Sequence, residues 1–407
     1  MNDPGQIDQA RTDQATVQKL VEEFLAEHPP PTTDDRTLRA ARFDAGLAFV
    51  HFDPGCGGLG LDRSLQPLVE RLFLDAGCAD WSARNVIGLG MGAATIHTHG
   101  TDEQRAKYLK PLFTGEEIWC QLFSEPGAGS DLAALATRAV PEGDGYIING
   151  QKIWTSLGHV ARRGLLVART DPDRPKHRGL SYFLLDMTSP GVEVRPLRQI
   201  TGQAEFNEVY LTDVFVPATD RLGAIGDGWR ISMTTLMNER VAIGGRGNRR
   251  GDGAIGHAVA SYRDAVHAGR AHPADRDRLM RLWTTVEAAR LTNIRAAAQV
   301  GRPTPGPEGS IAKLQYAELN KAVYELCVDL LGDAGMLIDN YTFSQPDLSS
   351  AASDAPDVRR AFLRSLANSI AGGTSEIMRN ILGERVLGLP GEPRNDRDRP
   401  WKDVPRS

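Results

Sequence analysis

A glycine-rich segment with hydroxyl side chains runs from Leu122 to Leu132. Gly127 and Gly129 predict an irregular turn there, because glycine is free to adopt positive φ. Ser124 and Ser130 place hydroxyl groups on the same turn. A glycine loop lets backbone N–H groups approach an oxygen-rich ligand closely. The segment therefore predicts a ligand-binding loop, although a lone Gly-x-Gly is more typical of a surface turn.

Two further segments carry side chains that could act with this loop. Gly150–Ser156 lies at the end of a β-rich run and contains Trp154. Glu239 lies among apolar neighbours in a helical stretch, where desolvation raises the pKa of a carboxyl group and suits it to proton abstraction. Taken alone, Trp154 is as typical of a core aromatic, and most Glu-Arg pairs such as Glu239–Arg240 are solvated.

The period of the apolar residues places these segments in three domains of an α+β protein. We expect a helical N-terminal domain (1–117), a middle antiparallel β domain (118–225), a C-terminal helical bundle (226–390) and a flexible tail (391–407). In the middle domain the β-rich runs are Tyr146–Ile148, Leu165–Ala168, Leu180–Asp186, Val192–Val194 and Glu208–Val216. The helices expected after them are 229–267, 275–300, 310–334, 357–369 and 375–387.

Composition excludes several classes of protein. The chain has 407 residues, of which 41% are apolar and 24% charged, and its net charge is −5. A nucleic-acid surface needs a basic excess, and no run approaches the ~18 apolar residues of a membrane span. Four scattered cysteines and a polar beginning favour a reduced cytoplasmic enzyme. His97 and His99 have no accompanying ligand cluster, so we expect no metal site.

The segment Leu122–Leu132 resembles the first signature of the acyl-CoA dehydrogenase family, and the resemblance extends from about Gly57 to Pro390. It implies an FAD-dependent oxidation of an acyl-CoA thioester to its α,β-enoyl form. It also implies an electron-transfer flavoprotein as acceptor and a dimeric or tetrameric assembly, homo- or heteromeric. The matching cofactor-binding positions are Gln121, Phe123, Ser124, Gly129, Ser130, Trp154, Thr155, Ser156, Thr374 and Glu376.

The family places its catalytic base at one of two positions. The first matches Gly372, which has no side chain, although its backbone N–H matches a donor to the thioester oxygen. The second, used by a branched- and long-chain subset, matches Glu239. The resemblance therefore implies that Glu239 abstracts the α proton while flavin N5 accepts the β hydride. The matching substrate-binding positions are Ser130, Asn238, Arg240 and Gly372.

Some positions depart from the family pattern. Met237 replaces a common aspartate of the pantetheine site, and Asp329 stands where a glutamine often contacts a neighbouring subunit's adenosine. The run 244–247, rich in glycine, suggests either a broken helix or a widened pocket for a large, branched or ring-bearing acyl group. The alternatives are a non-catalytic or partner subunit of a heteromeric dehydrogenase, a flavin oxidase or monooxygenase, and a dehydrogenase of carrier-protein thioesters.

Overall fold

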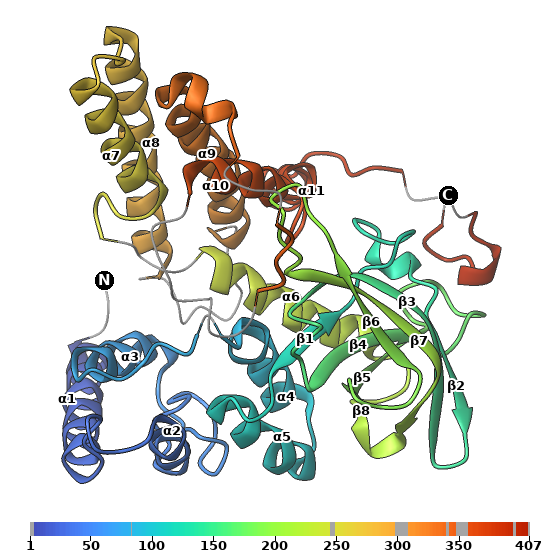
Figure 1. Ribbon diagram of the computed structural model, residues 1–407. Helices are drawn as coiled ribbons and strands as arrows, with labels where there is room; N and C mark the ends of the chain where they lie inside the picture. Colours follow the sequence, from blue (N-terminus) through green and yellow to red (C-terminus); the bar gives the residue numbers. More distant parts are fainter. Residues whose placement is uncertain are drawn as a thin grey trace.

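A computed structural model describes residues 4–82, 84–244, 249–297, 308–338, 342–346, 357–393 and 396–405. Helices occupy both ends of the chain and strands its middle, as the sequence predicts. In Figure 1 the blue N-terminal helices lie beside the green sheet, and the yellow and orange C-terminal helices extend away from both. None of the described helices has the length and apolar character needed to cross a membrane.

The N-terminal domain is built from α1 (Pro4–Glu27), α2 (Asp35–Asp44), α3 (Gln66–Asp75), α4 (Ala93–His99) and α5 (Asp102–Thr114). α1 buries Val17, Val21 and Phe24 on one face, the spacing expected of an amphipathic helix. α5 begins at a capping box, in which Thr101 and Gln104 each accept a hydrogen bond from the backbone of the other.

The middle domain is a single sheet with the strand order β6-β7-β3-β2-β4-β5-β8. Its strands are β1 (Trp119–Leu122), β2 (Arg138–Glu142), β3 (Gly145–Ser156), β4 (Arg163–Arg169), β5 (Leu180–Asp186), β6 (Val192–Leu197), β7 (Phe206–Pro217) and β8 (Arg221–Leu222). Leu165 and Val167 of β4 pack in one cluster with the N-terminal helices, and Leu166 and Ala168 pack on the other face. All the predicted strands therefore form.

Two strands lie in line along β4. Leu122 of β1 is opposite Leu166, and Arg138 of β2 is opposite Arg169, both in parallel orientation. The domain is therefore not purely antiparallel, as the sequence predicted, because β1 and β2 both run parallel to β4. Residues 123–137, which contain all of the glycine-rich segment except Leu122, connect the end of β1 to the beginning of β2.

The C-terminal domain consists of α6 (Gly228–Gly244), α7 (Ala254–His267), α8 (Pro273–Ala297), α9 (Glu308–Leu330), α10 (Val358–Ser365) and α11 (Ser375–Ile381). The single helix predicted over 229–267 is wrong, since α6 and α7 are separate. Gly251 and Gly253, just before α7, have φ of +85° and +73°, and helices disfavour glycine. α9 packs against each of the other helices of this domain, so it is the centre of the bundle.

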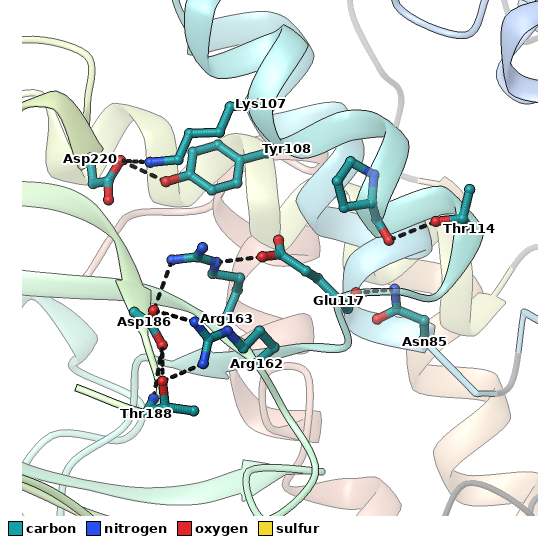
Figure 2. Close-up of polar contacts among 11 residues, drawn as sticks. Asn85, Lys107, Tyr108, Thr114, Glu117, Arg162, Arg163, Asp186, Thr188 and Asp220 are labelled. Carbon is teal, nitrogen blue, oxygen red and sulfur yellow. Dashed lines mark hydrogen bonds and ion pairs between the residues drawn. The ribbon is translucent and has the colours of Figure 1, made fainter. Parts of the chain in front are cut away.

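Charged side chains join α5 to the sheet, as Figure 2 shows. Lys107 Nζ and Tyr108 Oη lie 2.8 and 2.6 Å from Asp220 Oδ1. Arg163 of β4 donates from Nε to Glu117 Oε1 at 2.9 Å. Burial and the neighbouring Asp220 raise the pKa of Tyr108, so its hydroxyl stays protonated and remains a donor. These contacts fix the helical domain against the strands.

The flexible tail predicted from residue 391 is ordered over 396–405. Trp401 is only 9% exposed and Lys402 Nζ lies 2.5 Å from Asp173 Oδ1 of the middle domain. The tail differs from the expectation because an aromatic side chain buries enough area to hold a short polar segment in place.

Candidate functional site

The glycine-rich loop has an open backbone. A tight turn joins Glu125 and Ala128, whose backbone groups exchange hydrogen bonds of 3.1 and 3.0 Å. A side chain added at Gly127 or Gly129 would meet nothing within 4 Å. Neither glycine adopts the positive φ that the sequence suggested. Their contribution is therefore space at the surface of the loop, not a left-handed turn.

Glu125 closes the loop on itself. Its carboxylate accepts the backbone N–H groups of Ala136 and Thr137 at 2.6 and 2.9 Å. Beneath it, the buried Lys152 Nζ lies 2.8 Å from Glu125 Oε1 and donates to Phe123 O at 3.0 Å. Burial alone raises the pKa of Glu125, but Lys152 and the N–H donors outweigh it and lower the pKa. The Glu125 carboxylate is therefore ionised at neutral pH, while burial lowers the pKa of Lys152 from its ordinary value.

The end of β3 lies against this loop, because Ile153 N donates to Ser124 O at 2.9 Å. Trp154 has φ of +60° and is 56% exposed, with Phe206 packed edge-to-face 6.0 Å away. Positive φ is a strained conformation for a bulky residue. The next hydroxyl, Thr155 Oγ1, is buried without a hydrogen-bond partner among the described residues. The exposed Trp154 ring fits a planar ligand, whereas the Thr155 side chain is fully buried within the protein.

The remaining predicted cofactor positions of the middle domain differ in exposure. Gly129 and Ser130 are exposed on the loop, and Ser124, Gln121 and Ser156 are half-buried. The Phe123 ring is instead buried against Tyr182 at 5.9 Å. A contact of Phe123 with a ligand would therefore involve its backbone.

α6 carries Glu239 on the face that meets the other two domains. Ser232 and Thr235 on this face are fully buried. The Thr235 hydroxyl lies 3.0 Å from the hydroxyls of both Thr95 in α4 and Tyr182 in β5. Glu239 follows Thr235 by four residues, so it lies one turn further along the same face, and it is half-buried.

An arginine of the N-terminal domain reaches the residue before Glu239. Arg63 Nη2 donates to Asn238 Oδ1 at 3.3 Å, and Asn238 Nδ2 donates to Thr234 O at 2.9 Å. Nothing in the sequence pattern pointed to Arg63. The Arg240 side chain and residues 245–247 of the glycine-rich run lie outside the described part of the chain.

The loop that contains Gly372 is held by a buried lysine. Gly372 and Gly373 have φ of +65° and +93°, a conformation that favours glycine. Lys313 of α9 is buried and donates to Asn368 O at 3.0 Å and also to Gly373 O. Since α9 packs against α6 as well, it connects the elements that carry Gly372 and Glu239.

Thr374 and Glu376 lie at the beginning of α11. Thr374 Oγ1 caps the helix by accepting from Ile377 N at 3.1 Å, and the exposed Glu376 lies 3.2 Å from Arg379. Ser375 Oγ donates to Glu318 of α9 at 2.8 Å. Thr374 and Glu376 therefore lie on a helix that is anchored to the bundle, and not on the element that carries the glycine-rich loop.

The two histidines make protein contacts. His97 Nε2 accepts from Asp53 N at 3.2 Å, and His99 Nε2 lies 2.8 Å from Thr234 Oγ1. Both lie on α4. Within the described part of the chain, no group of three His, Cys, Asp or Glu side chains is arranged to hold a metal ion.

Comparison with known proteins identifies the family. Three family models match in order: the N-terminal domain of acyl-CoA dehydrogenase over residues 10–116, the middle domain over 120–214 and the C-terminal domain over 226–387. The chain belongs to the acyl-CoA dehydrogenase family. This confirms the resemblance, the enzyme class and the fold. Acyl-CoA dehydrogenases are flavin-dependent oxidoreductases.

Several relatives are similar over most of this chain. Acyl-CoA dehydrogenase IpdE1 of Mycobacterium tuberculosis is 36% identical and covers 86% of both chains. FadE34 of the same organism is 40% identical over 86% of this chain, which spans only 46% of that relative. Among solved structures, the Tcur3481-Tcur3483 steroid ACAD has a TM-score of 0.69 at 26% identity and covers 96% of this chain and 99% of its own. The ChsE4-ChsE5 complex of Mycobacterium tuberculosis has a TM-score of 0.67 at 28% identity, with the same coverage.

Proposed function

We propose that this acyl-CoA dehydrogenase uses Glu239 to take the α proton of an acyl-CoA thioester. The observation that carries the proposal is the side of the α6 helix on which Glu239 lies. Glu239 continues the face on which Thr235 contacts α4 and β5, so it lies toward the junction of the three domains. A carboxylate sheltered there can abstract a proton without competition from bulk water.

We propose that FAD binds between the glycine-rich loop and the end of β3. When bound, FAD supplies the acceptor for the β hydride. The open backbone at Gly127 and Gly129 and the exposed Trp154 ring support this placement. The hydroxyls of Ser124, Ser130 and Ser156 and, at α11, Thr374 and Glu376 are the further proposed contacts.

The thioester itself needs a donor and positioning groups. The backbone N–H of Gly372 is proposed to donate to the thioester oxygen, where it stabilises the enolate-like charge that forms as the proton leaves. Asn238 and Arg240 flank the base and are proposed to contact the substrate together with Ser130. Asn238 is already oriented by Arg63.

We propose a bulky, ring-bearing acyl group. The support is the similarity to a structure described as a steroid ACAD and the glycine-rich run at 244–247. An electron-transfer flavoprotein remains the proposed acceptor, and an acyl-carrier thioester the alternative substrate. A cytoplasmic location remains a prediction, which four free cysteines support.

A second candidate function is that of one subunit in a heteromeric dehydrogenase. The solved neighbours named above carry two protein names each, and FadE34 is about twice as long as the part that this chain matches. In such an assembly the partner subunit would share the work of binding FAD or substrate. The mass and flavin content of the purified protein distinguish this candidate from a homomer.

The test is anaerobic reduction of the purified flavoprotein by a panel of acyl thioesters, followed by the flavin absorbance. We expect bleaching with ring-bearing acyl-CoA thioesters. Glu239→Gln should keep the colour and bleach at least about a hundredfold more slowly, because it lacks the base. Glu325→Gln removes an exposed carboxylate of α9 that pairs with Arg278 and should bleach normally. Unchanged bleaching in Glu239→Gln would remove this residue from the base role.

A further inference from the structure

Residues 396–405, which we call the C-terminal arm, pack against the residues that follow the glycine-rich loop in the chain. The Trp401 indole N–H donates to Ala134 O at 3.1 Å. Ala134 belongs to the short 3-10 turn Leu132–Ala134, which directly follows the loop. In Figure 1 the red C-terminal segment accordingly lies beside the middle domain and not beside the bundle from which it comes.

Three successive carbonyl groups after the loop are held from two sides. Arg169 of β4 donates to Ala133 O at 2.6 Å and to Leu135 O at 3.1 Å. The indole N–H of Trp401 donates to the carbonyl of Ala134, which lies between these two residues in the chain. The Arg169 guanidinium also lies over the indole ring, with Cζ 4.2 Å from its centroid, which is cation–π geometry. Hydrogen bonds from the sheet and from the arm therefore both hold residues 133–135 in place.

An ion-pair bridge adds a second tie between the arm and the loop. Lys176 Nζ lies 2.8 Å from Asp131 Oδ2 and 2.5 Å from Asp396 Oδ2. Asp131 follows Ser130 directly, and Asp396 belongs to the arm. The Lys176 side chain is largely buried, whereas the Asp131 and Asp396 carboxylates are 57% and 34% exposed.

We propose that the C-terminal arm holds the glycine-rich loop in the conformation that binds FAD, with Trp401 and Asp396 as positioning residues. The inference rests on the proposed function, because it takes the loop to be part of a flavin site. The C-terminal family model ends at residue 387. The arm is therefore a feature of this chain beyond the part that the family model describes.

The test compares the full chain with a chain that ends at Pro393. Two quantities are measured: the FAD dissociation constant by quenching of flavin fluorescence, and amide hydrogen exchange of residues 128–137 without FAD. Without the arm, the dissociation constant should rise about tenfold, and exchange in this segment should become faster. Trp401→Ala and Asp396→Asn should each show part of both effects. Asp398→Asn, which removes the same charge from an exposed arm position, should show neither.

Unchanged FAD affinity and unchanged exchange in the shortened chain would overturn the proposal. If the full chain takes up no FAD, the proposed function fails, whereas the exchange data still decide whether the arm holds the loop. Should the shortened chain not fold, Trp401→Phe decides by the same two measurements. It keeps an aromatic ring against Arg169 and loses the indole N–H together with the five-membered ring that carries it.

Discussion

The ammonium group of Lys152 lies 2.8 Å from Glu125 Oε1, and both side chains are buried. Lys152 belongs to β3, two residues before Trp154, and Glu125 lies at the beginning of the glycine-rich loop. The same lysine also donates to the carbonyls of Phe123 and Val167. One buried cation therefore connects the two segments proposed to meet the flavin.

Removing the cation should destabilise the protein strongly. In Lys152→Met, the buried Glu125 carboxylate loses its counter-ion, which typically costs about 3–5 kcal/mol. The free energy of unfolding, measured with urea, reports the loss. Lys110→Met is the control, because its pair with Asp44 is exposed and such pairs contribute up to about 1 kcal/mol. Equal losses in the two variants would contradict a special role for the buried pair.

The Glu125 carboxylate should make stability depend on acid pH. Its pKa in the folded protein is lowered from the ordinary 4.5, with Lys152 and the backbone donors overcoming burial. A lowered folded pKa gives stability that is complete above about pH 4.5 and is lost as pH falls through the folded value. Glu125→Gln should therefore lose stability mainly at neutral pH, with a shallower decline below pH 4.5. Parallel curves for this variant and the native chain would refute the assignment; Glu325→Gln is the control.

Lys313 should affect turnover more than flavin content. In Lys313→Met, the carbonyls of Asn368 and Gly373 lose their donor, so the turn that carries Gly372 relaxes. Loss of one oxyanion donor typically costs about 10²–10³ in kcat, and misorientation should cost about tenfold or more. Steady-state kinetics and the flavin absorbance measure the two effects. A variant that loses its flavin but turns over normally per bound flavin would contradict this role, and Glu325→Gln on the same helix is the control.

The base should be movable between the two positions that the family uses. Gly372→Glu, introduced into Glu239→Gln, should restore part of the thioester-dependent bleaching. The restoration should be incomplete, because φ of +65° at residue 372 costs a side chain about 1–2 kcal/mol. Gly372→Gln in the same background has similar size without the carboxylate, and it should restore nothing. Recovery in both double variants would show that the carboxylate is not responsible.

Much of the fold follows from local patterns that the sequence displays directly. The apolar period marks α1, and the runs of β-branched and aromatic residues mark β3 to β7. The predicted helix 229–267 did not include the break between α6 and α7, although the glycine-rich run 244–247 pointed to one. No large apolar residue lies between Ile243 and Ala254, and Gly251 and Gly253 adopt left-handed φ before α7.

The candidate site divides in the same way. The glycine-rich loop and Glu239 stand out by residue type and order. Lys152 and Lys313 do not, because a buried lysine reveals its role only through partners distant in sequence, such as Gly373 O. The one available signal was a charged residue at an otherwise buried position of a strand or helix. Trp401 was missed because its partner, Ala134, lies more than half the chain away.

The alignment of β1 and β2 along the same side of β4 has an evolutionary consequence. Because both strands keep their register with β4 independently, the number of residues inserted between them does not shift the sheet. The segment 123–137 between the two strands can therefore be lengthened, shortened or replaced as a unit. New ligand chemistry can arise there by descent while the scaffold beneath is inherited unchanged.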